Sequence, residues 1–155
     1  MCLHIKSSFV AEKPIFVYKV GIRSNKCIVT CFQKMLLPFN KLNIDPEFDE
    51  KWHKNLLSVS NEYDSVAKFA DCGYFHAFTS LAKAKDFIVE GMWDDLRFCN
   101  YFLAIIPKGS VGFYGISDDI CANQMIFLNP EVPGFKEICS QYDITDDEYH
   151  KLLSS

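Results

Sequence analysis

The pattern of hydrophobic and polar positions in the middle of the chain predicts a strand, a helix and a second strand within Cys72–Gly109. Tyr74–Phe78 alternates as a strand that places Tyr74, His76 and Phe78 on one face. Leu81–Glu90 repeats its apolar residues at helical spacing, and Tyr101–Ile106 is apolar on both faces, as a central strand is. A titratable side chain, His76, therefore lies within an otherwise apolar strand.

The chain before this unit predicts a hairpin. We expect the first regular element after Pro14, because proline fixes its own φ and biases the preceding residue towards extended geometry. Ile15–Ile22 and Lys26–Gln33 are rich in β-branched and aromatic residues and should pair antiparallel. Residues 35–44 contain a proline and are expected to be irregular.

Two helices are expected next. Asp45, followed by proline and an acid, is a suitable N-cap, and apolar residues at i, i+4 and i+8 from Phe48 predict one buried stripe. His53 at the margin of that stripe is expected in solvent. A second, short helix is expected over residues 61–70, with Gly73 as the residue that ends it.

The last third of the chain predicts two further extended segments and a helical tail. Val111–Ser117 contains two glycines and is expected to be a looser element, whereas Ala122–Leu128 reads as a strand. A helical turn is expected over Phe135–Cys139, and Thr145 with Glu148 forms a capping box that begins a last helix.

These elements predict one α+β domain over residues 1–155, with a core at 15–128 and a C-terminal helical tail at 133–155. We expect a mainly antiparallel sheet, continuous or split, of about five or six strands, with about three or four helices packed on its faces.

Charge and composition narrow the classes of partner. The chain has 155 residues and a formal net charge of -4, from 16 Lys and Arg against 20 Asp and Glu. This balance provides no broad positive field for a phosphate backbone, so sequence-independent nucleic-acid binding is disfavoured. The sequence has no apolar run of about 18 residues that would span a membrane. Its 14 Phe, 7 Tyr and 2 Trp fill a large core or line a binding surface.

The seven cysteines are an odd number, and the N-terminus lacks the pattern of a secretory signal. Both features predict a cytoplasmic protein with reduced thiols. Cys27 and Cys31 share one strand face, and they are either core thiols, which we favour, or half of a metal site without a correctly spaced second half. The sequence therefore predicts no metal and leaves the reactivity of the thiols open.

His76 has two interpretations. It is a core histidine whose ring nitrogens are satisfied by the protein, or a ligand-facing group at the end of a strand that precedes a helix N-terminus. The first interpretation is favoured by a small margin.

Four motifs carry a resemblance. VYKV (17–20), GYFHAFTSLAKAK (73–85), AIIPKGSVGFYG (104–115) and ANQMIF (122–127) together resemble a family of small bacterial and phage proteins that has no assigned activity. The resemblance covers roughly residues 15–128, and it implies an origin in a phage or mobile element.

More distantly, the layout resembles ADP-ribosyltransferase-like domains, which act on bound nicotinamide dinucleotide. The resemblance implies that Lys19 takes the place of the basic residue on an early strand, and that Tyr74 and His76 lie on the middle strand. It places Gln124 where those domains carry a catalytic glutamate.

Two functions follow as hypotheses. The preferred one is a non-enzymatic binding protein without a cofactor, which docks onto a host protein or sequesters a small nucleotide-like ligand. The alternative is a transferase that uses NAD or a related nucleotide, with His76 as its catalytic residue. In either case the expected ligand-binding residues are Tyr18, Lys19, Tyr74, His76 and Gln124. A pocket that converges on Tyr18, Tyr74, His76 and Gln124 would favour the transferase, and a solid core there would leave it without a site.

Overall fold

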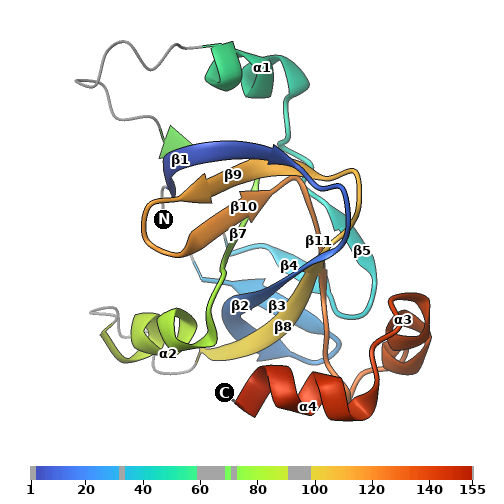
Figure 1. Ribbon diagram of the computed structural model, residues 1–155. Coiled ribbons are helices and arrows are strands. Elements are labelled where there is room, and N and C mark those ends of the chain that lie inside the picture. Colours follow the sequence, from blue (N-terminus) through green and yellow to red (C-terminus); the bar gives the residue numbers. More distant parts are fainter. Residues whose placement is uncertain (1–2, 32–33, 59–68, 71–72, 91–98, 155) are drawn as a thin grey trace.

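The computed structural model describes residues 3–31, 34–58, 69–70, 73–90 and 99–154. In this part of the chain eleven strands join in one sheet, and four helices lie against it (Figure 1). No helix within it is long and apolar enough to cross a membrane. In chain order the elements are β1 (Leu3–Val10), β2 (Ile15–Ser24), β3 (Cys27–Thr30), β4 (Leu36–Pro38), β5 (Leu42–Ile44), α1 (Glu50–Ser58), β6 (Phe69–Ala70), β7 (Phe75–Phe78), α2 (Leu81–Glu90), β8 (Asn100–Ile106), β9 (Val111–Gly115), β10 (Asp119–Ala122), β11 (Gln124–Phe127), α3 (Phe135–Gln141) and α4 (Asp146–Ser154).

Strand β2 is the centre of the sheet. The order is β5-β11-β8-β2-β7-β10-β9-β1-β6, with β4 joined to β2 through β3, and neighbouring strands pair antiparallel. One edge of β2 pairs with β8 from Ile15 to Gly21, and the other edge pairs with β7 at Tyr18 and with β3 from Gly21 onwards. The expected strand–helix–strand unit therefore exists as β7-α2-β8, but β2 is inserted between its two strands.

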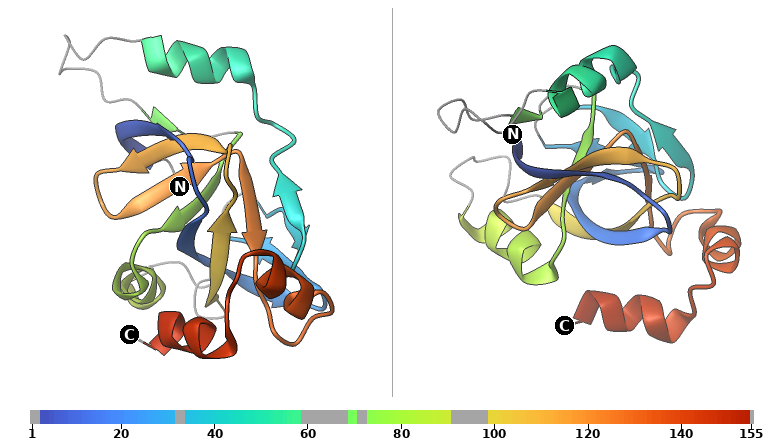
Figure 2. Two further views of the ribbon diagram at one scale, coloured as in Figure 1. Left: turned by 45° about the vertical axis from the view of Figure 1, so that its right-hand side comes forward. Right: turned by 45° about the horizontal axis from the view of Figure 1, so that its top comes forward.

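The sheet curves around an apolar interior. Strands β2, β3, β4, β7, β8, β10 and β11 all contribute to one buried cluster, in which Phe39, Phe75 and Phe127 are the large aromatic members. A second cluster lies on the outer face, where α2, α3 and α4 cover β2, β8 and β11. Both views of Figure 2 show α4 running below the sheet close to the C-terminus. The α+β class and the antiparallel pairing predicted from the sequence are confirmed.

A third, smaller cluster lies under α1. Tyr74 and Phe113 pack there with Phe48 and Leu56 from the α1 region. Figure 1 shows α1 at the opposite end of the molecule from α2 and α4. Among the described residues, the three clusters contain nine buried aromatic side chains, and seven partly buried ones pack against them.

Five strands were not expected, namely β1, β4, β5, β6 and β10. The chain forms β1 before Pro14, and it forms β4 and β5 within residues 35–44, which were predicted to be irregular. These strands exist through their partners, because β1 pairs with β9 and β5 pairs with β11. The predicted count of about five or six strands is therefore too low, and Ala122–Leu128 divides into the end of β10 and all of β11.

Helices α2, α3 and α4 begin where the sequence predicts, whereas α1 does not. Helix α2 has the predicted bounds, and the capping box is present, since Thr145 Oγ1 accepts the Glu148 N–H at 3.1 Å. The prediction of Asp45 as an N-cap was wrong, because α1 begins later and Asp49 Oδ1 accepts the N–H groups of Lys51 and Trp52. The predicted helix over 61–70 lies largely outside the described residues, and its end, residues 69–70, is strand β6.

Candidate functional site

Lys19 lies inside the protein. Its side chain projects from β2 on the same face as Val17, which belongs to the interior cluster, and the residue is only 7% exposed. The Nζ atom donates a hydrogen bond of 2.6 Å to the backbone carbonyl of His76. Burial lowers the pKa of Lys19 to about 8, and attraction to Cys31 and Asp45 offsets part of that shift. The ammonium is therefore held by the protein itself.

Asp45 is a second buried residue, and its carboxylate attracts the Lys19 ammonium. It follows β5, is 2% exposed, and uses Oδ1 to accept the Glu47 N–H at 2.9 Å. Burial raises the pKa of Asp45, whereas the Lys19 ammonium and the bond from Glu47 act in the opposite direction. Its other oxygen, Oδ2, is buried and has no hydrogen-bond partner among the described residues. Lys19 and Asp45 are thus two buried residues of opposite charge that influence each other electrostatically, which the sequence did not indicate.

His76 lies on the outer face of β7 and is half-buried. The predicted alternation of this strand is confirmed, because Phe75 and Ala77 belong to the interior cluster while Phe78 belongs to the outer cluster. Cys121 of β10 is its direct cross-strand neighbour. His76 therefore contributes its carbonyl oxygen to Lys19 and presents its ring to the other side of the strand.

The two candidate tyrosines lie in different clusters. Tyr18 is buried under the C-terminal helices and donates its hydroxyl to the Leu152 carbonyl at 2.8 Å. Tyr74 is buried under α1, where its hydroxyl lies 2.8 Å from His53 Nδ1. Both hydroxyls are thus used within the fold. The prediction that His53 lies in solvent was wrong, since this side chain is buried against Tyr74 and Phe113.

Gln124 is separate from the other candidates. It begins β11, is half-buried, and lies opposite Ile44 of β5. Strands β8 and β2 lie between β11 and β7 in the sheet. Of the five residues expected to bind a ligand, Lys19 and His76 are in contact, and Tyr18, Tyr74 and Gln124 lie in three other places.

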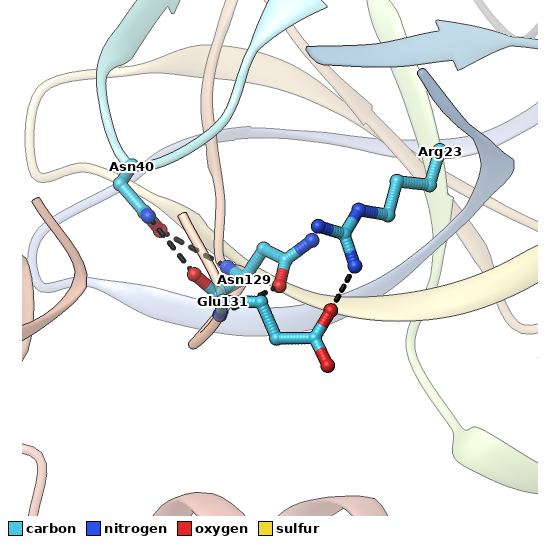
Figure 3. A network of polar contacts seen from close by, with 4 residues as sticks. All are labelled: Arg23, Asn40, Asn129 and Glu131. Atoms are coloured by element: carbon cyan, nitrogen blue, oxygen red, sulfur yellow. Dashed lines mark hydrogen bonds and ion pairs between the residues drawn. The ribbon is translucent and has the colours of Figure 1, made fainter. Parts of the chain in front are cut away.

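A surface pocket of about 560 Å³ lies at the tip of the β2–β3 hairpin. Beside it, Asn40 Nδ2 donates to the carbonyls of Asn129 and Val132 at 3.0 and 2.9 Å, and Asn40 Oδ1 accepts the Asn129 N–H (Figure 3). Arg23 forms an ion pair with Glu131 across the same region. The pocket is lined by Arg23, Ser24, Asn25, Lys26, Cys27, Leu36, Glu131, Val132 and Pro133.

The Asn40 network has a structural explanation. It fixes the loop after β11 against the turn before β5, and it satisfies backbone groups that would otherwise be buried without partners. Arg23 and Glu131 are both exposed, and such surface pairs contribute little to stability. The pocket offers few charged groups to a ligand. Its one acid, Glu131, already pairs with Arg23, which leaves Lys26 as the other base in the lining.

The outer edge of β5 is the feature that most resembles an interface. Asp45 donates its N–H to the Asn123 carbonyl at 2.9 Å, which continues the β5–β11 register of Ile44 with Gln124. In an antiparallel pair, residues alternate between bonding the neighbour and pointing away from it. Asn43 therefore bonds β11, and the backbone N–H and C=O of Leu42 and Ile44 point away from it.

No described strand pairs with that side of β5. The side chains of Leu42 and Ile44 are 50% and 59% exposed, although both are aliphatic. Figure 1 and both views of Figure 2 place β5 at the outside of the molecule. The edge thus combines open backbone groups with exposed apolar side chains. Sequence reasoning missed it because residues 35–44 were not expected to form strands.

Comparison of the chain with models of protein families, with curated proteins and with solved structures gave no match.

Proposed function

We propose that this protein is a non-enzymatic binding protein that docks onto a host protein by adding an extended segment of its partner to the edge of β5. The observation that carries the proposal is the open edge of β5, where Leu42 and Ile44 present both backbone hydrogen-bonding groups and exposed aliphatic side chains. An origin in a phage or mobile element fits a protein that acts on a host partner.

Strand addition uses the two features that this edge offers. Main-chain hydrogen bonds to the N–H and C=O groups of Leu42 and Ile44 supply affinity, and contacts with alternate side chains supply specificity. The two aliphatic side chains project on the same face of the strand. The Leu42 and Ile44 side chains can therefore pack against a partner segment that is extended and has an apolar residue at every second position. This is why a protein, rather than a small nucleotide-like ligand, is the proposed partner.

The other edges are less suited to this role. Strand β4 ends at Pro38, which has no N–H to donate, and β6 has two residues. Strand β5 is short as well, and Lys41 and Pro46 flank it. Short edges with such flanks avoid indiscriminate pairing, so the edge favours one selected partner over aggregation.

A binding role also agrees with how the polar candidates are used. The hydroxyls of Tyr18 and Tyr74 and the ammonium of Lys19 are bonded to groups of the protein itself. A ligand that needed these groups would have to displace Leu152, His53 and His76 from them. The non-enzymatic function therefore remains the preferred proposal over an NAD-dependent transferase.

The test uses Ile44→Pro. Proline removes the N–H that points away from β11 and leaves the β5–β11 bonds intact, so it blocks strand addition without breaking the sheet. Immobilised wild-type protein and variants are incubated with a bacterial lysate, and bound proteins are compared by quantitative mass spectrometry. Ile44→Ala keeps the backbone donor, and Ile116→Ala is the matched control at another exposed isoleucine.

We expect a protein that wild type and Ile116→Ala retain, that Ile44→Ala retains weakly, and that Ile44→Pro loses. Circular dichroism and the thermal midpoint report whether Ile44→Pro is folded, and Leu42→Lys provides a second variant that places a charge on the same edge. A partner that all four variants retain equally would overturn the proposal. So would a wild-type oligomer that Ile44→Pro dissociates, since the occupant would then be a second copy of the chain.

A further inference from the structure

Two thiols from distant parts of the chain meet on the outer face of the sheet. The Sγ atoms of Cys31 and Cys99 are 3.1 Å apart. Cys31 directly follows β3 and Cys99 directly precedes β8. These strands flank β2 on opposite edges at the same residue, because Gly21 pairs with both Thr30 and Asn100. The two thiols therefore meet over β2.

We propose that Cys31 and Cys99 are a redox site that forms a reversible disulfide. The sulfur atoms must approach by about 1 Å to reach the bonded distance of about 2.05 Å. Both cysteines adjoin strand ends rather than strand centres. The movement that brings the two sulfur atoms together therefore affects residues that make few hydrogen bonds within the sheet. This inference is independent of the proposed binding function.

The proposed oxidant is a low-molecular-weight disulfide such as oxidised glutathione. The Cys31 thiolate attacks one glutathione sulfur, which forms a mixed disulfide and releases one glutathione thiolate. The Cys99 thiolate then attacks the Cys31 sulfur, which forms the internal disulfide and releases the second glutathione. The two thiol protons pass to the two departing thiolates. The protein loses two electrons, and the oxidant takes up both.

The order of attack follows from exposure. Cys31 is half-buried, whereas Cys99 is buried, so a reagent from solvent reaches Cys31 first. Cys99 then acts as the resolving thiol. An accessible thiol beside a resolving partner is typical of redox-responsive cysteines.

The disulfide would connect β3 to β8 across β2. It would close a loop that contains β4, β5, α1, β6, β7 and α2, and cross-links that close long loops restrict the unfolded chain strongly. We therefore expect oxidation to raise the thermal midpoint, and reduction to restore the original value. The reactive thiols were not identifiable from sequence, because the pair depends on strands that are far apart along the chain.

Peptide mapping provides the test. The full-length protein is treated with oxidised glutathione under native conditions, remaining thiols are blocked with N-ethylmaleimide, and the product is digested with trypsin without reduction. A link between the peptides 27–34 and 98–108 is expected at a mass two hydrogens below their sum. The first peptide contains both Cys27 and Cys31, so Cys27→Ser is the matched control and Cys31→Ser is the test variant.

The link should persist in Cys27→Ser and disappear in Cys31→Ser and in Cys99→Ala. Oxidation should raise the thermal midpoint of wild type and Cys27→Ser but leave that of Cys31→Ser unchanged. The proposal fails if folded wild type shows no such link after oxidation, if Cys27→Ser removes it, or if the link appears only after unfolding in guanidinium. Far-ultraviolet circular dichroism of the reduced variants establishes that each comparison is made on folded protein.

Discussion

The burial of Lys19 depends on the groups that surround its ammonium. A lysine on an amphipathic strand usually reaches water, but this one points inward beside Val17 and bonds the His76 carbonyl. The energetic cost of burying an ammonium is large unless the charge is paired and hydrogen-bonded. The hydrogen bond to His76 satisfies part of this need, and the Asp45 carboxylate adds a smaller electrostatic attraction.

Lys19→Met is expected to lower the free energy of unfolding by about 2 kcal/mol, because it removes the hydrogen bond to the His76 carbonyl and the attraction that Lys19 exerts on Asp45. Asp45→Asn should cost less, since burial already raises the pKa of that carboxyl. In the double variant the two losses should not add, with an interaction energy of roughly 1 kcal/mol. Urea denaturation of the four proteins measures this cycle.

Lys26→Met is the control for the loss of a lysine as such, because Lys26 is exposed on the β2–β3 hairpin. Its effect should stay within about 0.5 kcal/mol. Strict additivity of Lys19→Met and Asp45→Asn would show that the two charges do not interact.

His53 predicts a pH dependence. Burial lowers its pKa below the ordinary 6.5, and the Glu50 carboxylate offsets part of this shift. As the pH falls through 6.5, the unfolded chain binds the proton before the folded chain does. The stabilising contribution is therefore present above this pH and is lost below it.

Urea denaturation at about pH 7.5 and at about pH 5.5 tests this dependence. Wild type should lose more stability on acidification than His53→Gln, which retains a hydrogen-bonding group near Tyr74. His150→Gln, at an exposed position, should behave as wild type does. Equal losses in wild type and His53→Gln would mean that other groups dominate the pH response.

For individual residues, the sequence predicted the surroundings of some side chains and missed those of others. The alternation of β7 was predictable, because Phe75 and His76 must face opposite sides of one strand. The burial of His53 was not, since it depends on Tyr74, which precedes β7, and on Phe113 of β9. The five residues expected to bind a ligand also do not come together in one place. Which side chains meet depends on the order of the strands in the sheet, and the sequence did not reveal that order.

Among elements, those with local signals were predictable and those with remote partners were not. Helix α2 and the capping box of α4 lie where their own residues place them. Strands β1 and β5 carry weak signals, and they are extended because β9 and β11 supply hydrogen bonds. Propensity is a weak guide for such edge strands, since pairing and burial set the preference.

Gly112 lies where strands β9 and β10 approach each other closely. A Cβ atom at this position would lie 1.8 Å from the Cys121 carbonyl oxygen of β10. We expect Gly112→Ala to lower the free energy of unfolding by about 3 kcal/mol, because backbone must move to admit the methyl group. Chemical denaturation provides the measurement.

The comparison variant is Gly109→Ala. Gly109 has a positive φ of 89° but no atom within 4 Å of the added Cβ, so only backbone strain applies. A loss of about 1 kcal/mol is expected. If Gly112→Ala proves no more harmful than Gly109→Ala, the close approach of β9 and β10 is not what selects glycine.

For the whole molecule, the helical tail is part of the domain. Helices α3 and α4 contribute Phe135, Cys139 and Tyr149 to the outer cluster, and Tyr18 near the N-terminus bonds Leu152 near the C-terminus. The sequence predicted the α+β class and the presence of these helices. It did not predict that they cover the centre of the sheet, because that contact joins the two ends of the chain.

Tyr18→Phe tests this connection. The variant removes one hydrogen bond to the Leu152 carbonyl and should cost about 1 kcal/mol. Hydrogen exchange followed by mass spectrometry should show faster exchange in α4, with α2 unchanged as the internal reference. Unchanged exchange in α4 would mean that apolar packing alone holds the tail in place.

The position of β2 also governs how the protein is made. This strand is synthesised well before β8, with which it makes its longest pairing and where Ile15 lies opposite Ile106. Sheets built from such distant pairings fold slowly. Until the later strand has been synthesised, the apolar faces of β2 have no cover, and the nascent chain must depend on chaperones or on rapid completion to avoid aggregation.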